Sequence, residues 1–343
     1  MRLLGKILFI IFVIALLTSG ATLALFSSWR TQRIAQLDKG SEVALTPSGE
    51  IEFARTTVNG PIILVFHAAP GGYDQGLLLG ENLGKNGFQI LAPSRPGYLR
   101  TPLATGLTPE AQADAAANLL DSLGVEKVGV LAFSLGCPAA IQFAVRHPER
   151  AWAVVLTSTV LRDYVPSRMY PHSLLGTLIL NKTYGDLPSW LLVNEAKHFP
   201  ERTILRMLSD ETNMGEQQKN KIGFAILKDP SQLDWFRKLL YTTAPMDVRQ
   251  AGFTNDVVQL RALPQLPYNP IKAPLLVING ANDADTPIAN LKTVMNRLPS
   301  AQLMTVEDSG PMVWLGPNAK AVNDRILAFM QLYAQPAATA SAP

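Results

Sequence analysis

The sequence predicts an α/β fold, in which a mainly parallel β-sheet is covered by helices. From about residue 42 onward, short β-rich runs alternate with helical patterns, which is the element order of such folds. Several runs are apolar at every position, as in Ile62–Phe66, and this composition is typical of a strand buried on both faces of a sheet. Loops rich in glycine and proline, such as His67–Gly76, follow the runs.

Composition supports a globular protein with a large core. The chain has 343 residues, enough for one large α/β domain with an inserted subdomain. Hydrophobic residues make up 48% and charged residues only 17%, which excludes a disordered chain. The net charge is +3 and the basic residues are scattered, so we expect no nucleic-acid partner. The single cysteine, Cys137, permits no internal disulfide, and we interpret it as a small buried packing residue.

The strands are predicted from the apolar runs. Glu42–Leu45 and Ile51–Thr57 lie close together and are expected to form an antiparallel opening pair. Six further strands are expected to be buried: Ile62–Phe66, Gln89–Ala92, Val128–Phe133, Ala153–Leu156, Leu275–Ile278 and Leu303–Val306.

Helices are predicted between these strands. Thr108 is a suitable N-cap, Pro109 a suitable first helical residue, and Gly124 a suitable stop. Residues 158–269 break the alternation, because they are rich in helical patterns and aromatic residues but contain no clear buried strand. An insertion of this length between two strands is predicted to be a helical lid.

The amino terminus is predicted to reach a membrane. Ile7–Phe26 is an apolar run of about twenty residues, which is long enough to cross a bilayer of about 30 Å. Residues 1–27 are therefore a membrane anchor or, alternatively, a signal peptide cleaved near Ser19–Ala21. We expect residues 28–41 to be a linker, residues 335–343 to be a disordered tail, and the folded domain to lie outside the cytoplasm.

Ser134 is the candidate nucleophile. It lies between the apolar run Val128–Leu131 and a helix-like stretch that begins at Ala139. Ala132 and Gly136 flank the serine at two residues on either side, and small residues are needed there because the turn between strand and helix is sharp. The segment therefore predicts a nucleophile elbow.

Loops at other predicted strand ends provide candidate partners for Ser134. The carboxyl ends of parallel strands form the ligand-binding edge of an open α/β sheet. The loop His67–Gly76 could present the N–H of Ala69 to an oxyanion, with the N–H of Leu135 as a second donor. Asp283 follows another strand and could orient a base, although Asp285 competes for this role.

These segments together resemble the α/β-hydrolase superfamily. The pattern combines an H-G-x-P-G-G-Y-D-Q-G loop, an A-P-S-R-P-G-Y loop, a G-x-S-x-G elbow and an H-G-x-x-D-x-x-x-P loop, in that order, over about residues 42 to 334. The resemblance implies an α/β-hydrolase fold with a core of residues 42–157 and 270–334. It also implies Ser134 as nucleophile, Asp283 as acid, and hydrolysis of an ester, amide or related acyl bond. It implies no metal and no cofactor.

The sequence departs from the family pattern at the general base. Ala68, Ala132 and Asn279 are small changes from the family residues, which a backbone can absorb. Pro311, in contrast, occupies the position of the family histidine and has no titratable group. No histidine follows His198, so the usual triad cannot be completed.

Other histidines are candidates for a substitute base. His67 either braces the oxyanion loop or takes part in proton transfer, whereas His172 and His198 belong to the predicted lid. His147 lies at a helix end before a proline and is interpreted as structural.

Two functions follow from this reading. The first is a membrane-anchored serine hydrolase that acts on a small or lipid-like ester with an impaired or relocated base. The second is a pseudo-hydrolase that keeps the fold for binding or scaffolding.

Overall fold

The computed structural model of the protein describes residues 2–160, 174–179, 181, 185–261, 271–295, 298 and 301–334. The chain divides into two compact units, residues 1–40 and residues 41–343. The predicted tail, 335–343, and His172 lie outside the described residues.

The first unit is a single helix. Helix α1 spans Arg2–Lys39, and an apolar stretch within it is long enough and apolar enough to cross a membrane. By length and composition this helix fits either an anchor or a signal sequence. At about 1.5 Å per residue its apolar part, Ile7–Phe26, spans about 30 Å. The residues that we expected to form a linker, 28–41, are therefore helical as far as Lys39.

The second unit is built on one mainly parallel sheet. The eight described strands lie in the order β1-β2-β4-β3-β5-β6-β7-β8, and only the pairs β1–β2 and β2–β4 are antiparallel. Their bounds are β1 Glu42–Thr46, β2 Gly49–Arg55, β3 Ile62–Phe66, β4 Gln89–Pro93, β5 Val128–Phe133, β6 Ala151–Thr157, β7 Leu275–Gly280 and β8 Gln302–Val306. This arrangement confirms the predicted fold class and the antiparallel opening pair.

One expected strand is less buried than the sequence indicated. The strands β5, β6 and β7 are buried at every position, because each has a neighbour on both sides and helices on both faces. Strand β8 is apolar too, yet four of its five residues are only half-buried. It lies at the edge of the sheet, and an apolar run alone does not distinguish an edge strand from a central one.

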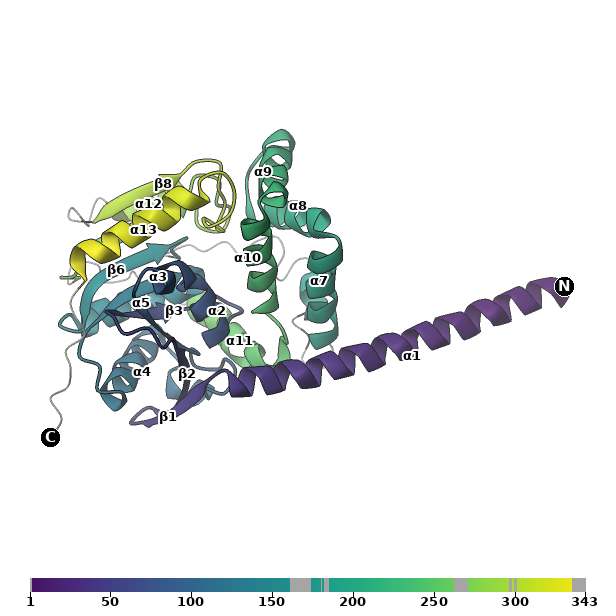
Figure 1. The fold of residues 1–343 in the computed structure, drawn as a ribbon, viewed down its shortest axis with the longest axis horizontal. Coiled ribbons are helices and arrows are strands. Elements are labelled where there is room, and N and C mark those ends of the chain that lie inside the picture. The colour runs from purple at the N-terminus through teal and green to yellow at the C-terminus, as the bar shows by residue number, and fades with distance from the viewer. Residues whose placement is uncertain are drawn as a thin grey trace. The chain divides into compact units, whose positions relative to one another are not determined.

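Helices cover the sheet (Figure 1). Helices α4 (Pro109–Ser122), α5 (Cys137–Arg146) and α12 (Ile288–Met295) belong to the apolar cluster that includes Leu64, Val130 and Val154. Helices α2 (Tyr73–Leu79), α3 (Glu81–Lys85) and α13 (Ala319–Tyr333) also contact strands or one another. Helix α4 begins as predicted, because Thr108 accepts a hydrogen bond from the N–H of Ala111.

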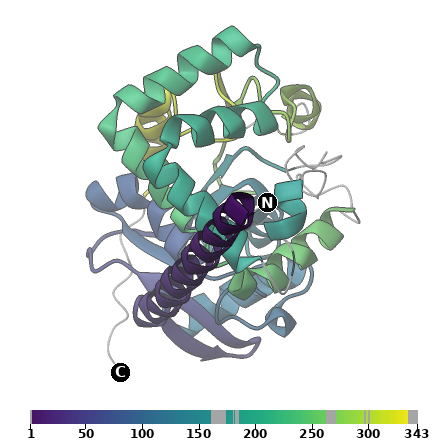
Figure 2. The same ribbon diagram turned by 90° about the vertical axis from the view of Figure 1, so that its right-hand side faces the viewer.

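The elements that the structure describes in the insertion between β6 and β7 are helices, joined by short turns and one isolated β-bridge. Its helices are α6 Leu174–Ile179, α7 Asp186–His198, α8 Pro200–Glu211, α9 Glu216–Lys228, α10 Pro230–Tyr241 and α11 Gln250–Arg261, with a short 3₁₀ turn, η3, at Asp247–Arg249. Helices α7 to α10 lie together as one group in both views (Figures 1 and 2). Buried residues such as Ile204, Ile226 and Phe236 give part of this group an apolar core of its own.

Candidate active site

Ser134 lies on a strained turn between β5 and α5. The turn consists of a short 3₁₀ helix, η2, at Ser134–Gly136, and Ser134 has a φ of 49°. A non-glycine residue in this region costs roughly 1–3 kcal/mol and persists only where its surroundings impose it. Among the described residues, the hydroxyl of Ser134 has no hydrogen-bond partner, and the side chain is half-buried. This is the geometry of a nucleophile elbow.

Gly136 brings the elbow against the end of β3. A Cβ atom at this position would lie 2.5 Å from the carbonyl oxygen of Phe66 and 2.6 Å from that of His67. Only glycine allows this approach without a backbone shift. The elbow, which includes Leu135, therefore packs against the start of the loop that carries Ala69. No hydrogen-bond partner of the N–H of Leu135 or of Ala69 is found among the described residues.

His67 holds two loops together through both ring nitrogens. Its Nε2 accepts a hydrogen bond from the N–H of Arg95 at 2.9 Å, so Nδ1 carries the proton and donates to the carbonyl oxygen of Ala68 at 2.7 Å. Complete burial, followed by the positive charge of Arg95, lowers the pKa of His67 well below its usual value. The imidazole is therefore neutral, and this arrangement leaves it no free nitrogen for the proton of Ser134.

The other described histidines are also separate from Ser134. His198 is exposed at the end of α7, and no hydrogen bond joins it to Ser134. His147 caps the end of α5 and contacts the carboxylate of Asp114 at 2.9 Å, which fits its predicted structural role. The described part of the chain therefore supplies no imidazole base to Ser134.

The second loop of the pattern, after β4, is fixed by a buried ion pair. Arg95 forms a two-pronged contact with Asp256 of α11, with N–O distances of 2.9 and 2.6 Å. The hydroxyl of Tyr98 donates to the same carboxylate at 2.6 Å. A Cβ atom on Gly252 would lie 2.2 Å from the ring of Tyr98, so α11 packs closely on this loop. Helix α11 thus binds loops of the core, although the sequence placed it in the lid.

Asp283 follows β7, as the sequence predicted for the acid. Its side chain is 1% exposed and forms a turn cap: Oδ1 accepts from the N–H groups of Asp285 and Thr286, and Oδ2 accepts from the hydroxyl of Thr286 at 2.7 Å. Burial outweighs these bonds and raises the pKa of Asp283 to about 6. In a complete triad, an imidazolium would compensate a carboxylate at this position.

Pro311 lies in a loop that packs directly on the acid loop. A Cβ atom on Gly280 would meet the carbonyl oxygen of Gly310 at 2.2 Å, and the N–H of Asn282 donates to the carbonyl oxygen of Ser309 at 2.9 Å. The loop is therefore where a base would meet the acid. The ring of Pro311 can neither accept nor donate a proton there.

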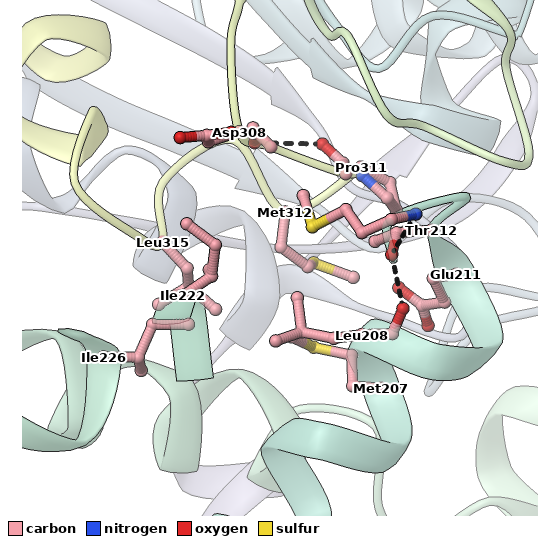
Figure 3. Close-up of a pocket in the computed structure, with 13 residues that line it drawn as sticks. Met207, Leu208, Glu211, Thr212, Ile222, Ile226, Asp308, Pro311, Met312 and Leu315 are labelled. Atoms are coloured by element: carbon pink, nitrogen blue, oxygen red, sulfur yellow. Dashed lines mark hydrogen bonds between the residues drawn. The ribbon is translucent and has the colours of Figure 1, made fainter. Parts of the chain in front are cut away.

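Glu211 is a residue of this region that the sequence analysis missed. It ends α8, and its carbonyl oxygen accepts from the N–H of Ala284 at 3.1 Å, while the next residue, Thr212, pairs with Asp283 in an isolated β-bridge. Figure 3 shows this end of α8 facing the loop that carries Pro311 across a small pocket. In the sequence, Asp210–Glu211 resembles an ordinary solvated helix end, so no local signal indicated the contact.

Among the described residues, no ion pair joins Glu211, Asp283 or Asp285 to a basic side chain. Burial, followed by the charges of Asp285 and Asp283, raises the pKa of Glu211 well above its usual value. Burial, followed by Asp283, raises the pKa of Asp285 to about 8. One oxygen of Glu211 and one of Asp285 are buried without a hydrogen-bond partner among the described residues. At neutral pH the cluster therefore retains protons that exposed carboxyl groups would have released.

Comparisons with known proteins agree with this architecture. The model of the family described as alpha/beta hydrolase fold matches residues 61–315. An alpha/beta hydrolase fold protein from Nakamurella multipartita has a TM-score of 0.77 and 26% identity, and the match covers 85% of this chain and 99% of that one. An uncharacterized hydrolase of Bacillus subtilis, YcgS, is 25% identical over 287 residues, which is 82% of this chain and 95% of the relative.

A relative with a named activity is also similar. A pimeloyl-[acyl-carrier protein] methyl ester esterase of Aromatoleum aromaticum is 26% identical over 233 residues, which is 65% of this chain and 80% of the esterase. The family match covers well over half of the chain and includes the elbow, the acid loop and the loop of Pro311. The protein therefore belongs to the α/β-hydrolase superfamily.

Proposed function

We propose that the protein is a serine hydrolase that cleaves an ester or a related acyl bond, with a general base that is impaired or relocated. The observation that carries this proposal is Ser134, which is held at a φ of 49° and whose hydroxyl has no hydrogen-bond partner among the described residues. A binding protein has no need of a strained serine at the end of a central strand. A nucleophile does, because the turn presents its oxygen to the substrate.

The reaction would proceed through an acyl-enzyme. The Oγ of Ser134 attacks the carbonyl carbon, and the carbonyl oxygen becomes an oxyanion that accepts hydrogen bonds from Ala69 and Leu135. Collapse of the tetrahedral intermediate expels the alcohol, and water then releases the acid from the serine. Each half-reaction needs a group that takes a proton from the attacking oxygen and returns it to the leaving one.

The described residues supply no imidazole for this proton transfer. Position 311 holds proline, both nitrogens of His67 are bound, and His198 is exposed. Turnover then depends on the oxyanion hole and binding, which alone give about 10³ to 10⁴-fold acceleration over water, or on His172, which lies outside the described residues.

We propose a small or lipid-like ester as the substrate. The similarity to an esterase that acts on a methyl ester supports an ester substrate. The apolar helix α1 supports a location at a membrane, where lipid-like esters are present. In this proposal residues 41–343 lie outside the cytoplasm. The helical insertion would act as a lid over the site.

The alternative is a pseudo-hydrolase that binds a ligand without turning it over. The observation that favours it is again Pro311, since the acid loop and the base loop are packed together as in a working site but lack the imidazole. The uncompensated carboxyl of Asp283 also fits a site that has lost its partner.

A fluorophosphonate probe separates the two functions, because it reacts only with an activated serine. Labelling of the full-length protein that is lost in Ser134→Ala supports the hydrolase. A Thr159→Ala variant, which changes another buried hydroxyl residue, is the control and should label normally. No labelling of the folded protein at any pH from 6 to 9, together with no turnover of a p-nitrophenyl ester, would leave the binding function as the better account.

A further inference from the structure

The loop between β3 and α2 is bound on both sides of Ala69. The side chain of Gln75 accepts a hydrogen bond from the N–H of Ala68 at 2.9 Å and donates one to the carbonyl oxygen of Pro70 at 3.1 Å. The peptide N–H of Ala69 lies between these two bonds and has no partner among the described residues. Its direction is therefore set by its neighbours rather than by a bond of its own.

Arg249 binds the same loop one residue further on. Its Nη1 donates to the carbonyl oxygen of Gly71 at 2.6 Å, and its Nη2 contacts the carboxylate of Asp74 at 3.0 Å. The Arg249 side chain is fully buried. A Cβ atom on Gly72 would lie 2.7 Å from Nη1, so the loop and the guanidinium are in close contact. The Nε of Arg249 has no described partner, which leaves the two Nη atoms as its hydrogen-bonding contacts with the protein.

The groups that hold this loop come partly from the helical insertion. Arg249 ends η3, and Thr242, just after α10, accepts a hydrogen bond from the Nε2 of Gln75 at 3.3 Å. The backbone joins as well, because the N–H of Leu99 donates to the carbonyl oxygen of Val248 at 2.6 Å. The segment 242–249 is thus attached to the core at the candidate oxyanion hole.

We propose that Arg249 is a positioning residue that, together with Gln75 and Thr242, fixes the direction of the Ala69 N–H toward the substrate oxygen at Ser134. This inference rests on the proposed hydrolase function. A donor in an oxyanion hole must point to where charge develops, and a misplacement of about 1 Å can cost about 10²-fold in rate. Arg249 suits this task because its planar fork binds the Gly71 carbonyl and the Asp74 carboxylate at once.

The test compares three variants of the full-length protein. Arg249→Gln removes the charge and the fork, and Arg249→Lys keeps the charge but cannot reach both partners. Thr242→Val removes the two hydrogen bonds of the hydroxyl, with Gln75 and with the carbonyl oxygen of Leu239, with little change of shape. Arg146→Gln, which breaks an exposed pair with Asp114, is the control. The readouts are kcat and KM on p-nitrophenyl butyrate, and hydrogen–deuterium exchange of the peptide that covers residues 67–76.

The proposal expects loss of kcat with KM nearly unchanged. We expect kcat to fall roughly 10- to 100-fold in Arg249→Gln, less in Arg249→Lys, and severalfold in Thr242→Val. Exchange should rise in residues 67–76 but not across the sheet, and Arg146→Gln should match the unaltered protein. Should Arg249→Gln fail to fold, Thr242→Val and Arg249→Lys decide the question.

Three outcomes would overturn the proposal. The first is an unchanged kcat in Arg249→Gln and Thr242→Val. The second is a rise of KM alone, and the third is faster exchange over the whole domain with activity that follows the folded fraction. If the unaltered protein neither turns over nor labels, the hydrolase function fails separately. Exchange in residues 67–76 then shows whether Arg249 still fixes the loop, and unchanged exchange rejects that role too.

Discussion

Ser158 donates a hydrogen bond from its hydroxyl to the carbonyl oxygen of Pro311 at 2.6 Å. Ser158 directly follows β6 and has a φ of 46°, and its N–H donates to the carbonyl oxygen of Ile278 in β7. It therefore connects the loop of Pro311 to β6 and β7, of which β6 pairs with β5, the strand that leads into the elbow. The backbone at position 311 is held in place by bonds that do not involve the proline ring.

Pro311→His should supply a general base at a position where the backbone is already held next to the acid loop. We expect kcat on a small activated ester to rise at least about 10-fold, because a placed general base contributes about 10²- to 10⁴-fold. Adding Ser134→Ala or Asp283→Asn should remove the gain. Pro311→Ala is the matched control, since it loses the ring without supplying an imidazole. A gain of equal size in Pro311→Ala would show that the proline, rather than the missing base, limits the site.

His172 is the remaining histidine that could replace the base. If the unaltered protein turns over at rates typical of serine esterases, His172→Ala should abolish turnover while His198→Ala, at an exposed site, should leave it intact. Steady-state kinetics on p-nitrophenyl esters measures both. Full activity in His172→Ala would exclude this residue and leave catalysis without any histidine.

The carboxyl cluster should make the protein less stable as the pH rises. The pKa is raised to about 6 for Asp283 and to about 8 for Asp285 in the folded state, above the usual value of 3.8. A group whose pKa is higher in the folded state stabilises the fold fully when the pH is below its pKa in the unfolded state. This stabilisation is lost as the pH rises through its pKa in the folded state. The unfolding free energy should thus fall between about pH 4 and pH 8.

Asp285→Asn should flatten this pH dependence. At pH 8 we expect the unfolding free energy of Asp285→Asn to exceed that of the unaltered protein by at least about 1 kcal/mol, because one unit of pKa shift corresponds to about 1.4 kcal/mol. Denaturant titration of the full-length protein in detergent, followed by tryptophan fluorescence from pH 4.5 to 8, measures the effect. Asp324→Asn, an exposed carboxyl paired with Lys320, is the control and should retain the slope of the unaltered protein. If the unfolding free energy of Asp285→Asn depends on pH as steeply as that of the unaltered protein, the pKa of this carboxyl is not raised.

The amino-terminal helix should remain attached and hold the protein in the membrane. The full-length protein should resist carbonate extraction, and mass spectrometry should recover peptides that contain Leu25 and Phe26. A Leu16→Arg and Leu17→Arg double variant places two charges in the apolar stretch and should release the protein into the soluble fraction. A soluble native chain that begins near Thr22 would identify the segment as a signal peptide instead.

The sequence predicted the features that depend on local composition. The buried strands are visible because β3 to β7 are covered on both faces and must be apolar along their length. The sharp turn at Ser134 was predictable because such a turn requires small residues around it. Helix α4 was predictable because its cap and first proline directly precede the helical pattern and a glycine closely follows it.

The features that the sequence did not reveal depend on contacts between distant segments. Arg249 lies more than 170 positions from Gly71, and Glu211 more than 70 from Asp283, so no spacing or periodicity links them. The assignment of residues 242–261 to the lid followed from their helical pattern, and pattern alone cannot show that α11 binds core loops. The helical form of residues 28–39 was missed because polar residues there resemble those of a linker.

The positive φ of Ser134 has a cost in folding stability that other residues would reduce. A positive φ costs roughly 1–3 kcal/mol for most side chains, but asparagine and glycine adopt it at lower cost. If stability were the only requirement, these two residues would be better choices for the elbow than serine. Under the proposed hydrolase function, serine at this position lowers stability in exchange for a nucleophile, and the close packing of Gly136 on β3 holds the strained turn in place.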